Sequence, residues 1–198
     1  VMPRLIGVVC GNTFFDSWRR RVCEGLEGNI IELGFGSGTN LPFLPAAVRH
    51  VVAVEPSLTA RAGAQSRMRA SNVGIEFVDL DGPESLGANS LDGALCAFTL
   101  CSVLDPDAIL RQLLRVLKPD AAFHFLEHGL APDSHTALWQ HRLNGLEQRV
   151  AGGCRLTRDP LELVSAAGFE IESSVQEYAK GPKPWSYFTL GVARKPLS

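Results

Sequence analysis

Short apolar runs alternate with amphipathic segments along most of the chain. The runs are nearly all apolar and cover residues 29–33, 51–55, 75–80, 93–98 and 122–127. This composition is typical of strands that are buried on both faces of a sheet. Segments compatible with helices lie between them, and such alternation favours a parallel sheet with helices on both sides. A last strand is expected over residues 185–193, after a turn at residues 181–184.

Two helices are indicated by the residues at their ends. Asp105 is an N-cap residue, and Pro106 follows it at the first helical position. The next turns place leucine and isoleucine on one side and charged residues on the other, and Pro119 is expected to end the helix. Asp159, again followed by proline, predicts a second start, and Gly168 supplies the left-handed position after that helix.

The composition is that of an ordinary globular chain. Of the 198 residues, 45% are hydrophobic and 20% are charged, and the net charge of −2 gives no basic footprint for nucleic acid. No apolar run approaches the roughly 18 residues of a membrane span. Five cysteines without a CxxC pair favour a reducing compartment and argue against a structural zinc site. We therefore predict one cytoplasmic domain over residues 1–198, without a metal, in which residues 1–28 form a helical cap.

A glycine-rich loop directly follows the first predicted strand. Residues 30–40 read IIELGFGSGTN, with glycine at positions 34, 36 and 38. Because glycine has no side chain, a loop of this kind can turn sharply and its backbone can approach a ligand closely. A dinucleotide site would read GxGxxG, whereas Thr39 occupies the position of the third glycine. The loop therefore favours a nucleoside ligand without a pyrophosphate and disfavours a nicotinamide oxidoreductase.

Acidic residues follow the next two predicted strands. Glu55 ends the run VVAVE about twenty residues after the glycines, where an acid commonly meets ribose hydroxyls. Asp81 ends the run FVDLD and could accept a hydrogen bond from an adenine amino group. Asp79 is the competing candidate for that role. Together with the loop, these acids predict a nucleoside site at the carboxyl edge of the sheet.

At this point the chain resembles a known family. The stretches IIELGFGSGTNLPF, VVAVEPS, LDGALCAFTLCSVLDPDAILRQLLRVLKPD, FLEHG and GGCRLTRD are similar to class I S-adenosylmethionine-dependent methyltransferases. They resemble in particular the small-molecule group of the methyltransferase type 11 class. This group includes thiol methyltransferase-like proteins and proteins labelled phosphatidylethanolamine or quinone methyltransferases. The resemblance covers residues 3–195.

The resemblance implies a Rossmann-like α/β fold with a seven-stranded, mostly parallel sheet and an antiparallel last strand. It also implies S-adenosyl-L-methionine as cofactor. Glu32 and the glycine loop would hold its methionine part, Glu55 its ribose, Asp81 with Gly82 its adenine, and residues 96–99 would line the sulfonium side. The cofactor-binding residues would be Glu32, Gly34, Phe35, Gly36, Gly38, Asn40, Glu55, Pro56, Asp81, Gly82, Cys96 and Thr99.

The chain departs from the family pattern at two places. LKPD replaces the usual LKPGG, and Asp120 tolerates left-handed geometry well enough to keep the turn. The stretch FVDLDGPESL is one residue longer than the usual spacing, which leaves the adenine ligand open between Asp79 and Asp81.

Methyl transfer from a sulfonium demands alignment and exclusion of water more than a particular catalytic residue. His128 is the candidate base or substrate hydrogen-bonder, and a loop histidine bonded to backbone is the alternative. A helix over residues 133–150 belongs to an insertion, residues 129–160, that we expect to form a substrate lid. Trp139 is expected in the core, while Arg155 and Arg158 either meet an anionic substrate or pair with acidic neighbours.

The leading hypothesis is methyl transfer to a small apolar molecule, such as a thiol, phenol or amine. A lipid or quinone methyltransferase at a membrane surface is the first alternative, because the start VMPRLIGVVC is apolar and could touch a membrane peripherally. A non-catalytic S-adenosylmethionine-binding regulator is the second. The oligomeric state and the identity of the methyl acceptor are not indicated by the sequence.

Overall fold

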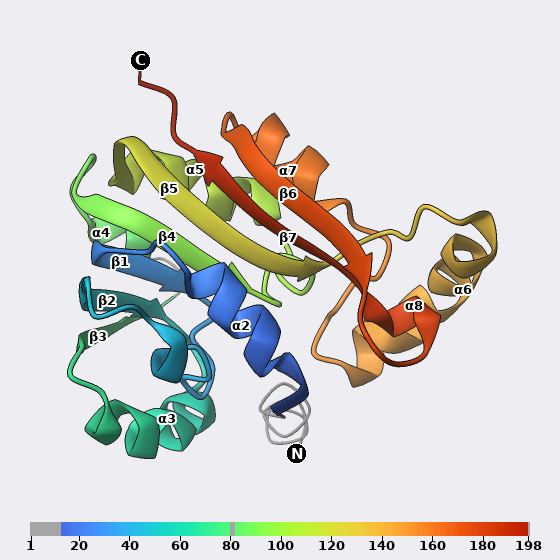
Figure 1. Ribbon diagram of the computed structural model, residues 1–198, viewed down its shortest axis with the longest axis horizontal. Helices are drawn as coiled ribbons and strands as arrows, with labels where there is room; N and C mark the ends of the chain where they lie inside the picture. The colour runs from blue at the N-terminus through green and yellow to red at the C-terminus, as the bar shows by residue number, and fades with distance from the viewer. Residues whose placement is uncertain (1–12, 80–81, 198) are drawn as a thin grey trace.

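The computed structural model describes residues 13–79 and 82–197, and a seven-stranded sheet forms its centre (Figure 1). The strand order is β3-β2-β1-β4-β5-β7-β6. Six strands run in one direction, and β7 is antiparallel to both of its neighbours. This confirms the predicted Rossmann-like arrangement. The strands are β1 Gly28–Leu33, β2 Val48–Val54, β3 Gly74–Val78, β4 Leu91–Ala97, β5 Leu117–His128, β6 Glu170–Tyr178 and β7 Tyr187–Arg194.

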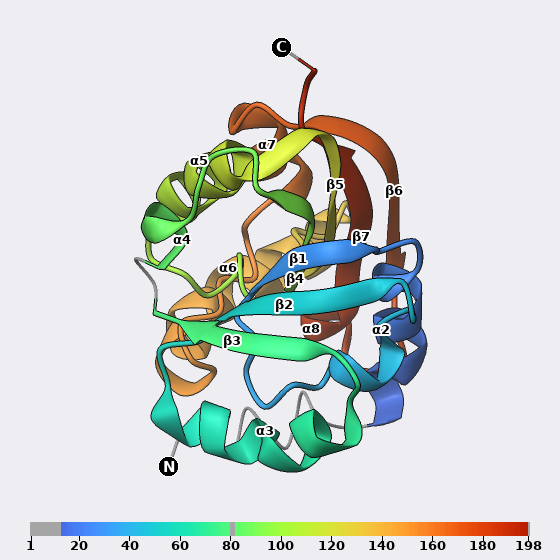
Figure 2. The ribbon, with the colours of Figure 1, turned by 90° about the vertical axis from the view of Figure 1, so that its left-hand side faces the viewer.

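Helices cover both faces of the sheet (Figures 1 and 2). One core layer lies between the sheet and the helices α2 and α3, and the other lies under α5 and α7. The helix α6 stands beyond the carboxyl end of β5, next to α8. The helices are η1 Thr13–Phe15, α2 Asp16–Cys23, η2 Leu41–Phe43, α3 Leu58–Ala70, α4 Gly82–Ser85, α5 Pro106–Val116, α6 Ser134–Val150, α7 Pro160–Ala166 and α8 Lys183–Ser186.

The predicted helix starts are confirmed by their caps. The Asp105 carboxylate accepts a hydrogen bond from Ala108 N at 2.9 Å, and Asp159 accepts one from Leu161 N at 2.9 Å. Asp133 caps α6 in the same way. Each cap satisfies an N–H group that the first helical turn leaves without an intrahelical partner.

The helix α5 ends earlier than predicted. It stops at Val116, and Pro119 lies inside β5 instead of terminating the helix. Leu117 already has an extended backbone (φ −69°, ψ 143°) and is fully buried, so the sheet captures the chain before the proline is reached. Asp120 adopts φ 62°, which confirms that aspartate takes the left-handed position of this turn.

Four further details differ from the sequence-based expectations or complete them. Trp185 lies in α8, and the last strand begins two residues later, at Tyr187. The edge strand β6 was not predicted from its own residues, because its exposed sequence EIESSVQEY lacks an apolar run. Among the described helices, none has the length and apolarity that crossing a bilayer would require. Residues 1–12 of the expected cap lie outside the described residues.

Candidate functional site

The glycine loop after β1 lies at the carboxyl edge of the sheet, as predicted. Gly34, Gly36 and Gly38 all have positive φ angles, of 69°, 58° and 71°. A Cβ on Gly34 would lie only 2.0 Å from Thr99 Oγ1, so this glycine packs the loop against the residues after β4. A Cβ on Gly36 would meet no atom closer than 3.8 Å. The space beside Gly36 is therefore open, as a ligand cradle requires.

The carboxylate of Glu55 joins the glycine loop to the end of β2. Its two oxygens accept hydrogen bonds from Gly36 N and Ser57 N, both at 2.8 Å. A carboxylate oxygen has two lone pairs, so each oxygen can accept a further bond from a ribose hydroxyl. Pro56, the next residue, is exposed. The predicted ribose ligand is thus oriented at the loop by backbone contacts.

Glu32 is buried at the end of β1 and is only partly satisfied. Its Oε1 accepts a hydrogen bond from Asn40 Nδ2 at 2.8 Å, and Arg19 in turn donates to Asn40 Oδ1. Among the described residues, its Oε2 has no hydrogen-bond partner. Burial raises the pKa of Glu32 to about 7, although Asn40 and Arg19 both act to lower it. A cationic donor would satisfy this oxygen.

The adenine side is described only in part. Asp81 lies outside the described residues, whereas Gly82 begins α4 and donates a backbone hydrogen bond to Asp79 O at 2.9 Å. The Asp79 carboxylate is exposed and pairs with Arg61 Nη2 at 2.5 Å. The carboxylate of Asp79, the alternative adenine ligand, is therefore engaged by Arg61. The assignment of Asp81 as the adenine ligand stays a prediction.

Two predicted cofactor residues have side chains in the core. Phe35 is buried and stacks edge-on against Phe77 with ring centroids 5.4 Å apart. Cys96 is fully buried and donates to Glu127 Oε1 at 3.2 Å. Because these side chains are occupied in the core, any contact with the cofactor would come from the main chain, and the assignment of both residues stays a prediction.

Glu127 organises the loop that follows β4. Its carboxylate is fully buried and accepts backbone hydrogen bonds from Thr99, Leu100 and Cys101, at 2.8, 2.9 and 3.1 Å. The preceding residue, Phe98, has φ 57°. A non-glycine residue pays about 1–3 kcal/mol for such a conformation, which clusters at functional sites. Although Glu127 stands in the motif FLEHG, its role in holding the Thr99 loop could not be predicted, because the contact joins residues of two neighbouring strands.

An aromatic wall, made of Phe15, Phe98, His128 and Phe188, lies at the same edge. The Phe98 ring is 5.2 Å from Phe15, 5.3 Å from His128 and 5.4 Å from Phe188, measured between centroids. The His128 and Phe188 rings are 5.0 Å apart. These contacts bring the candidate base, predicted from the sequence, into an apolar surface beside the Thr99 loop.

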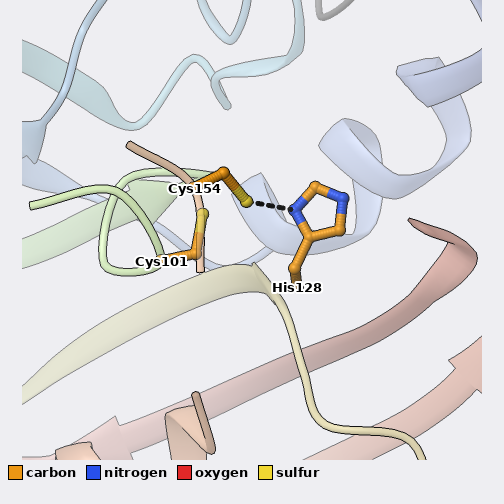
Figure 3. A group of neighbouring side chains, drawn as sticks. All are labelled: Cys101, His128 and Cys154. Carbon is orange, nitrogen blue, oxygen red and sulfur yellow. Dashed lines mark hydrogen bonds between the residues drawn. The ribbon is translucent and has the colours of Figure 1, made fainter. Parts of the chain in front are cut away.

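His128 also meets two cysteines, Cys101 and Cys154, as Figure 3 shows. One potential ligand atom from each residue lies within 4.8 Å of the other two, and Cys154 Sγ is 3.8 Å from His128 Nδ1. A hydrogen bond with Cys154, together with burial, raises the pKa of the Cys101 thiol well above its ordinary value. Burial lowers the pKa of His128, but its hydrogen bond with Cys101 and nearby negative charge raise it by more.

The segment that carries Cys154 is fixed to the loop after β4. Arg155 N donates to Cys101 O at 2.8 Å, and Arg158 donates to the carbonyl of Leu100. Arg158 is thus engaged with a main-chain carbonyl, and the two alternatives predicted for Arg155 and Arg158 stay predictions. The expectation for Trp139 was wrong: it is 42% exposed, on a side of α6 that also exposes Leu138 and Leu146. His124 is buried in the core, and His135 and His141 lie on α6, as expected.

A cavity of about 770 Å³ opens at the opposite edge of the sheet, where Gly28, Asp92 and Lys118 lie at or near the starts of their strands. Ligands of open α/β sheets bind at the carboxyl edge, so this cavity is not the predicted cofactor site.

Comparison with known proteins agrees with this geometry. A family model described as a methyltransferase domain matches residues 31–125, which include the glycine loop, Glu55 and the Thr99 loop. Thiol S-methyltransferase TMT1B of Rattus norvegicus is 31% identical over 172 residues, which cover 83% of this chain and 68% of the relative. The chain belongs to the class I S-adenosylmethionine-dependent methyltransferases. Its cofactor is therefore S-adenosyl-L-methionine.

Solved structures support the same fold. A SAM-dependent methyltransferase from Methanosarcina mazei aligns with a TM-score of 0.66 and 22% identity, over 86% of this chain and 93% of that one. The [4+2]-cyclase SpnF aligns with a TM-score of 0.71 and 21% identity, over 92% and 81%. Since proteins named for different reactions share this fold, the methyl acceptor has to be argued from the site.

The residues of the methyltransferase site fit the cofactor. The cofactor carries an ammonium group, which matches the buried, unpartnered Oε2 of Glu32. It also carries a ribose diol, which matches the carboxylate of Glu55, and Gly36 leaves open space between the two acids. The fit rests on charge and hydrogen-bonding capacity, because the two acids offer acceptors and the cofactor offers donors, and the individual contacts stay predictions.

Proposed function

We propose that this methyltransferase transfers the methyl group to the sulfur of small apolar thiols. The observation that carries the proposal is the aromatic wall beside the Thr99 loop, where the half-buried rings of Phe98 and His128 pack against the buried ring of Phe188. Such rings suit an apolar acceptor and exclude water from it. The relative named as a thiol S-methyltransferase supports sulfur as the accepting atom.

The residues of the chain have separate tasks in this proposal. The cofactor, when bound, supplies a methyl group on a sulfonium with a neutral thioether as leaving group. Glu32 and Glu55 bind and orient its polar ends, while the Thr99 loop, fixed by Glu127, shapes the wall toward the acceptor. The helix α6 and the segment at residues 151–158 serve as the lid that closes over the acceptor.

A thiol needs less help from a protein base than a phenol does. The ordinary pKa of a thiol is near 8.5 and that of a phenol near 10, so a thiolate forms with little help from a base. His128 can accept the thiol proton or hydrogen-bond to the acceptor, since its ring is part of the aromatic wall. The apolar surroundings favour neutral, uncharged substrates over anionic ones.

Three acceptors that share one ring test the proposal. Thiophenol, phenol and aniline are each incubated with the protein and cofactor labelled in its methyl group, with protein-free samples as controls. We expect kcat/KM for thiophenol to exceed the other two values by at least about tenfold, a difference of ~1.4 kcal/mol in transition-state stabilisation. Faster labelling of phenol or aniline would show that the acceptor is not a thiol.

The membrane-surface alternative is supported by one specific observation. The helix α6 exposes Leu138, Trp139, Leu146 and Val150. Such a face could touch a bilayer and collect a lipid or quinone substrate. Flotation with phosphatidylcholine vesicles, with and without phosphatidylserine, decides this point: recovery of the protein with vesicles, and faster turnover of a long-chain quinol than of thiophenol, would favour the alternative.

A further inference from the structure

We propose that Cys101, His128 and Cys154 form a binding site for a thiophilic divalent metal ion of the zinc class, with one coordination position left for the sulfur of the substrate. Two thiolates and an imidazole are a ligand set found in catalytic zinc sites, which keep a fourth position open. This role for the site rests on the proposed thiol methylation. It departs from the sequence-based expectation that the chain holds no metal.

The geometry of the cluster is close to that of a tetrahedral site. Ligand atoms around zinc lie roughly 3.5–3.8 Å from one another, given metal–ligand bonds of about 2.0–2.3 Å. Cys154 Sγ and His128 Nδ1 are already 3.8 Å apart, and the three atoms all lie within 4.8 Å of each other. Binding therefore needs a contraction of roughly 1.0–1.3 Å at most, which side-chain rotation can supply.

The backbone holds the two cysteines together independently of any metal. Arg155 N donates to Cys101 O at 2.8 Å, which pairs the strand-end loop with the segment of Cys154. Gly153 has φ 93°, and a Cβ there would lie 2.9 Å from Ser102 O, so this close approach requires glycine. His128 joins them from the last position of β5. Three separate segments thus converge on one point.

The electrostatic surroundings suit a site with two thiolates. Arg158 donates to the carbonyl of Leu100, and its guanidinium lies near enough to interact with Cys101, Cys154 and Glu127. With a divalent ion and two thiolates the site itself is neutral, and Arg158 balances the buried carboxylate of Glu127. A neutral cluster avoids the cost of burying unpaired charge.

The three residues of the cluster lie beside the Thr99 loop, which we expect to line the methyl group of the cofactor. Cys101 is two residues after Thr99, whose Oγ1 fills the space beside Gly34, and His128 is part of the aromatic wall. With His128 engaged as a metal ligand, a thiol that binds the open position would give its proton to solvent in place of His128 and become a thiolate on the metal. The thiolate sulfur then bonds to the methyl carbon as the bond from that carbon to the sulfonium sulfur breaks. The products are a methyl thioether and the neutral thioether form of the cofactor.

Cobalt titration of the full chain tests the site without relying on activity. The protein is stripped with a chelator, kept reduced with a phosphine, and titrated with Co²⁺ and then Zn²⁺ under nitrogen. We expect one equivalent of Co²⁺ to bind per chain and to produce a sulfur-to-cobalt charge-transfer band. Zn²⁺ should displace the cobalt and abolish this band. Cys101→Ser and Cys154→Ser should each weaken binding at least about 100-fold, since even outer partners of a metal contribute 10–100-fold. Cys23 is a buried free cysteine of α2 outside the cluster, so Cys23→Ser is the matched control. This variant should bind Co²⁺ like wild type.

The outcomes separate the metal site from the proposed function. Absence of a sulfur-to-cobalt band in the wild type overturns the site, whether or not the variants fold. Thiophenol should shift the cobalt spectrum of the wild type, and absence of that shift overturns the substrate role. Thiol methylation at an undiminished rate by stripped protein would also refute that role while the proposed function stands.

Discussion

The carboxylate of Glu55, at the end of β2, accepts a hydrogen bond from the backbone N–H of Gly36, in the loop after β1, across 2.8 Å. This contact joins the two features that the sequence separates by nineteen residues, the glycine loop and the distant acid. It orients the carboxylate before the cofactor arrives, so little ordering remains for binding.

Replacement of Glu55 tests this relationship. Glu55→Ala removes the acceptor for Gly36 N, Ser57 N and the ribose, and charge-assisted hydrogen bonds contribute roughly 1.5–3 kcal/mol each, so cofactor affinity should fall by about two decades or more. Glu55→Gln should lose less, because its amide oxygen still accepts. Calorimetry gives the affinities, and kcat at saturating cofactor should change little, because the ribose keeps its charge during transfer. Wild-type affinity in Glu55→Ala would remove the ribose assignment.

The loop glycines Gly34 and Gly36 and the helical Gly145 should respond differently to substitution. Gly36→Val should abolish cofactor binding, because its side chain fills the open space of the cradle. Gly34→Ala should instead destabilise the fold, since its Cβ would lie 2.0 Å from Thr99 Oγ1. Gly145→Ala in α6 meets no atom within 4 Å and serves as the control, with a stability gain of about 0.5–1 kcal/mol. Urea unfolding and calorimetry together distinguish the three results, and a folded Gly36→Val that binds normally would contradict the cradle.

The buried Glu32 should make stability depend on pH. Its pKa rises from 4.5 to about 7 in the folded protein without cofactor. Between these values the folded state holds a proton that the unfolded chain has lost, so the free energy of unfolding should fall as pH rises, by on the order of 3 kcal/mol in total. Urea unfolding from pH 4.5 to 7 measures this slope, which Glu32→Gln should flatten.

Cofactor binding should also release a proton through Glu32. An ammonium group beside its free oxygen favours the charged carboxylate. At pH 6 the uptake of cofactor should therefore expel a fraction of one proton, which calorimetry in buffers of different ionisation enthalpy detects. Equal proton release in Glu32→Gln would mean that another group is the source.

The exposure of Trp139 predicts a small effect on stability. Trp139→Ser should change the free energy of unfolding by less than about 1 kcal/mol, because the side chain is 42% exposed. Phe123→Ala, in a fully buried position, should cost about 3–5 kcal/mol and is the reference. Urea unfolding of both variants makes the comparison. A loss of several kcal/mol from Trp139→Ser would mean that its face of α6 is covered in solution.

Local patterns predicted the fold well because they reflect local physics. The strands β1, β2 and β4 are apolar and largely buried, and the aspartate caps act within three residues of their own position. The limits of the prediction have equally physical causes. The edge strand β6 needs no apolar face, and α5 ends where Leu117 enters the sheet, before any helix-breaking residue.

The site could be predicted from the sequence only for residues that belong to one motif of known spacing. The glycine loop and Glu55 follow a known spacing, so their meeting could be expected. Glu127 and the pair of Cys101 and Cys154 are brought to the same edge by three segments of the fold. Sequence spacings carry no sign of contacts between residues 26 or more positions apart.

The most direct test of the central claim, that this cradle serves S-adenosylmethionine, is calorimetry of the full chain with three ligands. S-adenosylmethionine and its demethylated product should both bind with one site per chain, NAD should bind far more weakly, and Gly36→Val should bind none of them. Tight binding of NAD, with no heat from the demethylated product, would contradict the account.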